Sequence, residues 1–146
     1  MSAGLPIGKF QFDSTGRLKV DASFGANTAS TSNSTTTPLG IAGVFNGAYE
    51  QVLDFSQITL TITADQDAAA GGVVVTWSTD GVTDDTVNAY DFLLTEGSKT
   101  IIIPVQAEFY KVDYTNGGVG QATFRMEVRS KTSRHVHRIK CMTLLS

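Results

Sequence analysis

Residues 56–63 constrain the fold more than any other part of the chain, because they alternate between apolar and polar side chains. Three large aliphatic residues are interleaved with three threonines, in the order Ile58, Thr59, Leu60, Thr61, Ile62 and Thr63. A period of two puts one row of side chains into a core and the other toward water or a partner. The segment therefore predicts a β-strand with one buried face.

The same alternation recurs along the chain, and turn residues separate the alternating segments. Residues 122–129, for example, place Ala, Phe, Met and Val on one face and Thr, Arg, Glu and Arg on the other. No window has convincing helical periodicity, so we expect at most one short helical turn, near residues 68–70. We predict strands at residues 43–45, 51–54, 57–64, 73–78, 88–94, 99–105, 109–114, 121–129 and 136–144.

So many short strands in 146 residues predict a single all-β domain, an antiparallel two-sheet β-sandwich of jelly-roll or related topology. We assign the sandwich to residues 41–146. Residues 1–40 are interpreted as an extended N-terminal arm. The arm contains a small hairpin, residues 9–20, and a polar linker, residues 27–37, in which no large apolar residue occurs.

The composition gives no indication of a membrane protein or of export. No apolar run approaches the roughly 20 residues that a membrane-spanning helix needs. The N-terminus lacks the basic start and apolar stretch of a secretory signal. Cys141 is the single cysteine, which excludes a disulfide within the chain and fits a reducing site of folding such as a cytoplasm.

Charge is distributed unevenly along the chain, although the net charge is only −3. No Lys or Arg occurs between Lys19 and Lys99, where all charged residues are acidic. The C-terminal part is basic, with Glu127 among Arg125, Arg129, Lys131, Arg134, Arg138 and Lys140. The acidic and basic regions are either ordinary solvated charges, or the acidic region of one copy contacts the basic region of the next. The second arrangement favours head-to-tail contacts, which can close into rings. The short basic cluster and the acidic balance argue against direct nucleic-acid binding.

Two groups of residues could bind a metal ion, and neither predicts one strongly. Five aspartates lie in two turns that would have to meet at one end of the sandwich: Asp65, Asp67, Asp80, Asp84 and Asp85. Their spacing fits no calcium motif, and Asp is common in tight turns. His135, His137 and Cys141 share a strand face, but Arg134 and Arg138 would repel a cation there. We therefore predict no metal and no cofactor.

Catalysis and sugar binding are also weakly indicated. The chain shows no nucleophile, base and orienting group in a recognisable context, so we predict that it is not an enzyme. Trp77 shares a strand face with Val73 and Val75, which favours a place in the core. A carbohydrate-binding platform would instead need exposed rings among Trp77, Tyr90, Tyr110 and Tyr114.

Four segments of the chain together carry a resemblance to known proteins. They are residues 45–52 (FNGAYEQV), 58–67 (ITLTITADQD), 75–81 (VTWSTDG) and 109–117 (FYKVDYTNG). With these the chain resembles a β-sandwich module of tailed-bacteriophage virion proteins, and residues 12–20 (FDSTGRLKV) resemble a segment near the start of phage structural proteins. Residues after Lys131 match no pattern of this kind. The resemblance implies a virion component with no catalytic residues to carry over.

On this basis we expect a capsid decoration (cement) protein, made in the host cytoplasm and bound to the virion head as a homo-oligomer, with a trimer favoured. The sandwich would lie over junctions between subunits of the major capsid protein, and the arm along neighbouring chains. The arm residues expected to bind a partner are Leu5, Ile7, Phe10, Phe12, Arg17 and Leu18. The residues expected to pair between subunits are Arg125, Arg129, Arg134, Arg138 and Lys140.

Two alternatives remain open at this point. The same sandwich would serve a tail, baseplate or fibre-attachment component of the virion, which differs from a decoration protein in copy number. A carbohydrate-binding module is the other alternative, and it predicts that Trp77 or a tyrosine lies exposed in a shallow groove.

Overall fold

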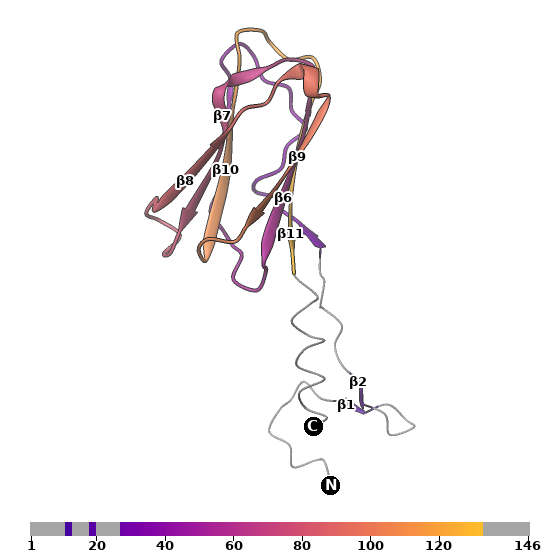
Figure 1. The fold of residues 1–146 in the computed structure, drawn as a ribbon, viewed down its shortest axis with the longest axis vertical. Coiled ribbons are helices and arrows are strands. Elements are labelled where there is room, and N and C mark those ends of the chain that lie inside the picture. Colours follow the sequence, from indigo (N-terminus) through magenta and orange to yellow (C-terminus); the bar gives the residue numbers. More distant parts are fainter. Residues whose placement is uncertain (1–10, 13–17, 20–26, 133–146) are drawn as a thin grey trace.

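The alternating segments form two antiparallel sheets that face each other in the computed structural model (Figure 1). The structure describes residues 11–12, 18–19 and 27–132. The first sheet has the order β3-β11-β6-β9. Its strands are β3 (Asn27–Ala29), β6 (Gln57–Ala64), β9 (Ser98–Pro104) and β11 (Phe124–Lys131).

The second sheet has the order β4-β10-β7-β8, and the short β5 pairs with β10 beyond the end of β4. Its strands are β4 (Val44–Asn46), β5 (Glu50–Gln51), β7 (Ala68–Ser78), β8 (Thr86–Tyr90) and β10 (Phe109–Asn116). Consecutive strands mostly alternate between the sheets. Neither sheet is therefore built from one continuous stretch of sequence, and the predicted two-sheet β-sandwich is confirmed.

A separate pair of very short strands, β1 (Gln11–Phe12) and β2 (Leu18–Lys19), forms the predicted hairpin. Gln11 pairs with Lys19 and Phe12 with Leu18.

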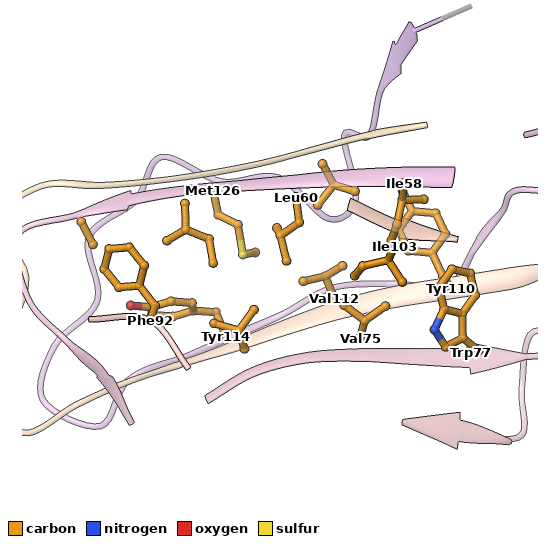
Figure 2. Packing of buried hydrophobic residues seen from close by; sticks show 14 of the residues in the cluster. Ile58, Leu60, Val75, Trp77, Phe92, Ile103, Tyr110, Val112, Tyr114 and Met126 are labelled. Atoms are coloured by element: carbon orange, nitrogen blue, oxygen red, sulfur yellow. The ribbon is translucent and has the colours of Figure 1, made fainter. Parts of the chain in front are cut away.

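The inward rows of both sheets make one hydrophobic core (Figure 2). The alternation of β6 has the predicted phase, because Ile58, Leu60 and Ile62 are fully buried. Within the second sheet, the rings of the register partners Trp77 and Tyr110 lie 6.0 Å apart between centroids. The remaining buried hydrophobic residues are Val52, Ala64, Val73, Val75, Phe92, Ile103, Val112, Tyr114, Phe124, Met126 and Val128.

The strand registers define two ends of the sandwich. At one end, here called the base, the chain enters at Asn27 and leaves after Lys131, and these two residues are paired (Figure 1). The base also carries the connections 52–56, 79–85 and 105–108. The opposite end, the tip, carries the connections 65–67, 91–97 and 117–123. No helix among the described residues is long and apolar enough to cross a membrane.

Two local predictions are wrong. Residues 68–70 are not a helical turn but the start of β7, and the one short helix of the described part is a 3-10 turn, η2 (Leu94–Glu96). Residues 27–37 are not a linker outside the sandwich: β3 pairs with β11, and Thr35 bridges to Met126. Small polar side chains can be buried where they find hydrogen-bond partners, and composition alone does not reveal this. The predicted strand at 136–144 lies outside the described residues.

Candidate functional site

The arm residues expected to bind a partner are only partly described. Phe12 and Leu18 are partners in the backbone register of the β1–β2 pair. The other four lie outside the described residues: Leu5, Ile7, Phe10 and Arg17.

The basic residues of β11 do not stand alone. Arg125 and Arg129 share the outward face of the strand with Glu127, which forms an ion pair with each of them. The Nε–H of Arg129 donates to Glu127 at 2.6 Å, and this bond, with the charge of both arginines, lowers the pKa of the Glu127 carboxyl. Part of the charge expected to act between subunits is therefore compensated within the strand. Arg134, Arg138 and Lys140 lie outside the described residues.

The five aspartates considered for calcium do not form one cluster. Asp65 and Asp67 belong to the tip, whereas Asp80, Asp84 and Asp85 belong to the base. The two turns do not meet at one end, as a shared calcium site would require, because β7 runs the length of the sandwich between them. Within the described residues no three His, Cys, Asp or Glu side chains are placed to hold a metal ion. His135, His137 and Cys141 lie outside that part of the chain.

Asp80 instead organises the turn that leads into β8. Its carboxylate accepts hydrogen bonds from the backbone N–H groups of Thr83 (2.7 Å) and Val82 (2.8 Å) and from the hydroxyl of Ser78 (2.9 Å). These donors hold the pKa of Asp80 well below its usual range, because they stabilise the ionised form. Gly81 follows with a φ of 77°, a conformation that side chains disfavour.

Asp84 ties the same turn to the outer face of the second sheet. It accepts a hydrogen bond from the hydroxyl of Tyr49 and lies 3.3 Å from the Nζ of Lys111. The same ammonium group lies 4.8 Å from the centre of the Tyr49 ring, within the range of a cation–π contact. Desolvation, followed by the bond to Asp84, raises the pKa of Tyr49 to about 12. Tyr49, Asp84 and Lys111 thus hold this turn against the outer face of the second sheet.

The aromatic residues that a sugar site would need are buried. Trp77, Tyr110 and Tyr114 are fully buried, as the alternation of their strands predicts. The indole Nε1–H of Trp77 donates to Asn88 Oδ1 at 2.8 Å, so its polar group is satisfied inside the fold. Tyr90 is half-buried against the core. The exposed Trp77 or tyrosine platform of a carbohydrate-binding module is therefore contradicted for these three residues.

A buried polar cluster that the sequence did not reveal joins the two sheets along one side. Ser30 and Asn33, from the segment after β3, are both buried. The hydroxyl of Ser30 donates to Glu50 Oε2 at 2.7 Å, and Asn33 Nδ2 donates to the carbonyl oxygen of Ala48 at 3.1 Å. We call these residues the Asn33 clip. Serine and asparagine in a polar segment gave no signal of burial.

The clip also fills a gap in the hydrogen bonding of β10. The backbone N–H of Val112 lies between the residues of β10 that pair with β4 and with β5, and it donates to Asn33 Oδ1 at 2.8 Å. Gly47 crosses the same point so closely that a Cβ there would lie 2.1 Å from Asn33 Oδ1. Only glycine allows this approach.

Beside the clip, the segment 29–36 leaves a shallow hollow against β11. It has a volume of about 290 Å³ and is lined mostly by small polar side chains together with Arg125, Met126 and Glu127. Because Arg125 and Glu127 pair with each other, the hollow presents no unbalanced charge.

Exposed apolar residues lie at both ends of the sandwich: Val82 (81% exposed) and Leu53 (63%) at the base, and Ile41, Leu93, Leu94 and Val119 at the tip. Ile41 is 71% exposed and Val119 57% exposed, and the backbones of their two loops are joined by hydrogen bonds such as Ala42 N–H to the carbonyl oxygen of Gly117. Leu93 and Leu94 are exposed in the neighbouring connection. A group of apolar side chains facing water is typical of a contact surface.

Comparison with known proteins yields a similar fold and no family. No protein-family model and no curated protein matches the chain. Among solved structures, the PBSX exported protein XepA is similar with a TM-score of 0.54 and 14% identity over 85% of this chain. The chain spans about half of XepA, 48% of its length. A Bacillus endospore appendage that forms disulfide-linked pili matches over 80% of this chain and 99% of its own, at 13% identity and a TM-score of 0.43.

Proposed function

We propose that this chain is a non-enzymatic structural component of a bacteriophage virion, most specifically a capsid decoration protein that binds the major capsid protein. The observation that carries the proposal is the pairing of Asn27 with Lys131 at the base of the sandwich. Because the chain enters and leaves at one point, the segments before residue 27 and after residue 132 both start from the base. Both are available to anchor the sandwich to the particle from the same side.

The arm contains the apolar residues that such an anchor needs. Leu5, Ile7, Phe10 and Phe12 precede the sandwich. Each large apolar side chain contributes about 1.5–3 kcal/mol if it is fully buried against a neighbouring chain. Repeated over many copies, these contacts would hold capsid subunits together against the pressure of packaged DNA. The closed core and the absence of exposed Trp77, Tyr110 and Tyr114 rings favour protein contacts over sugar binding.

The likeness to XepA supports this proposal at the level of fold. It shows a similar sandwich in the PBSX exported protein XepA. A phage-derived particle component and an extracellular structural protein both agree with it.

The apolar tip favours a second candidate, a tail, baseplate or fibre-attachment component. A chain with an anchor at its base and the exposed Ile41, Leu93, Leu94 and Val119 at its tip has two opposite contact surfaces. Such a chain can connect two partners, whereas a decoration protein needs contacts on one side.

The copy number of the chain in purified particles tests the proposal. Quantitative mass spectrometry against the major capsid protein should give one copy or more per few capsid subunits for a decoration protein. A few copies to a few dozen per particle would assign the chain to the tail or a fibre base. Absence from particles would overturn the virion proposal.

A deletion of the arm tests whether it is the anchor. Removing residues 2–25 should abolish attachment to particles, while circular dichroism still shows a folded β-sandwich. Normal attachment of the deleted chain would exclude the arm as the anchor.

A further inference from the structure

The two sheets of the sandwich have four lateral edges, and three of them are guarded against pairing with another strand. β3 is only three residues long. The edge formed by β4 and β5 is interrupted at Gly47, where the Asn33 clip covers it. β9 carries Pro104 at its base end and Lys99 at its tip end, and proline and lysine are common guards of edge strands.

The fourth edge, that of β8, has none of these features. Its five residues are Thr, Val, Asn, Ala and Tyr, without a charge or a proline. They pair with β7 in an unbroken register from Val73–Tyr90 to Trp77–Thr86, so no bulge turns the strand away. Among the described strands none pairs with the other side of β8. A strand edge of this kind presents free N–H and C=O groups to a further strand.

The outer face beside this edge is apolar. Asn88 faces the core side, where it accepts the bond from Trp77, so Val87 and Ala89 lie on the outer face by alternation. Val87 is 56% exposed, and Ala89 is exposed beside the half-buried Val74. A strand added here would cover these side chains as well as satisfy backbone groups.

The β1–β2 hairpin, in turn, has no third strand paired with it among the described residues. A two-stranded hairpin alone is at best marginally stable in water and needs a further strand or a packing surface. Among the described strands, β1 and β2 pair with nothing but each other. Their register pairs two residues that are apolar in the sequence, Phe12 and Leu18.

Charge supports the same match. Asp84 and Asp85 directly precede β8 and Asp91 directly follows it, and all three are exposed. Asp84 also pairs with Lys111, while Asp85 accepts from Thr79 and Asp91 from the N–H of Gly71. The hairpin segment 9–20 contains Lys9, Arg17 and Lys19 against Asp13. The net positive charge of the hairpin segment is therefore complementary to the acidic residues that flank β8.

We propose that the free edge of β8 receives the β1–β2 hairpin of a second copy of this chain by strand addition. The contact is heterologous, since the hairpin of one copy meets the β8 of the next, and such contacts form closed rings when the rotation allows. The hairpin belongs to the same arm as the proposed anchor, but Val87→Lys leaves the whole arm in place. Its oligomeric state in solution therefore tests this contact separately from attachment to particles.

Substitutions at two edges of the sandwich test the proposal in the full-length chain. Val87→Lys places a charge on the β8 edge, and Ile102→Lys places the same charge on the β9 edge at a residue of similar exposure, 56% against 63%. Sedimentation velocity should show an oligomer for the wild type and for Ile102→Lys, and a monomer for Val87→Lys. Ala89→Lys is a second β8 variant if Val87→Lys does not fold.

Complementation then identifies the occupant. The double variant Phe12→Asp/Leu18→Asp removes the apolar pair of the hairpin but keeps β8, and it should also be monomeric. Mixed with Val87→Lys, which keeps the hairpin, it should form a heterodimer that cannot grow further. A monomeric wild type, an oligomeric Val87→Lys, or a mixture that stays monomeric would each overturn the proposal. An oligomeric hairpin variant would show that another segment occupies the edge, which also overturns it.

Discussion

The two lateral sides of the sandwich differ in how they end. On one side, the Asn33 clip joins β3 to the β4–β5 edge with buried hydrogen bonds, so the sheets are held together there by polar groups. On the other side, β8 and β9 are the last strands of their sheets. There the core joins the sheets, with Trp77 as its largest fully buried side chain, and an exposed hydrogen bond of 2.7 Å runs from Lys99 Nζ to the carbonyl oxygen of Asp91.

This difference separates two tasks that a β-sandwich must perform. A closed side fixes the relative position of the sheets, because a buried amide tolerates little displacement of its partners. An open side keeps a strand edge available for another chain. Here the closed and the open side lie on opposite sides of one core.

Replacing Trp77 by alanine tests what holds the open side and should have the largest effect. The side chain is fully buried, contacts Tyr110 and donates to Asn88. Its loss should lower the free energy of unfolding by about 3–5 kcal/mol, measured by urea titration. A near-neutral change would mean that the core does not support this side, and it would reopen the sugar-binding alternative.

Asn33→Ala tests the closed side and should cost less. The variant leaves the buried N–H of Val112 without its acceptor and removes a donor to Ala48. We expect the free energy of unfolding to fall by about 1–3 kcal/mol. Ser32→Ala, an exposed residue of the same loop, is the matched control and should change it by less than about 0.5 kcal/mol. Equal effects of the two substitutions would show that the clip adds no stability.

The open side could be predicted from the sequence in more detail than the closed side. Alternation places Ile58, Leu60 and Ile62 in the core, and it assigns Trp77 and Tyr110 correctly because period-two burial depends only on local order. The clip depends instead on contacts between residues far apart in the chain, such as Asn33 with Val112. The only trace in the sequence was a run of Ser, Thr and Asn, which is equally typical of a linker.

The candidate contact surfaces were predicted less completely than the fold. The β1–β2 hairpin followed from its turn residues. The alternation of residues 122–129 placed Arg125, Glu127 and Arg129 on one face, but no ion pair among them was predicted from it. The length of β7 was underestimated, because it starts at Ala68 rather than at residue 73.

Low pH should lower the free energy of unfolding through Asp80, in the turn before β8. Folding lowers the pKa of Asp80 below its ordinary value near 4, so its contribution to stability is present above that pH and is lost as the pH falls toward the folded pKa. Asp80→Asn should therefore flatten the decline of the unfolding free energy below about pH 4. Urea titrations across this acid range measure the slope, with Asp54→Asn in another base loop as the control. An unchanged slope in Asp80→Asn would contradict the assigned role.

The smallest change in the free energy of unfolding is expected for substitutions at the edge strands β8 and β9. Val87→Lys and Ile102→Lys each place a charge on an exposed residue, at which no buried contact is lost. At low protein concentration, where association contributes least, both should change the free energy of unfolding by less than about 0.5 kcal/mol. A loss as large as that of Asn33→Ala would mean that the edges of β8 and β9 stabilise the monomer. The contrast between a closed and an open side would then fail.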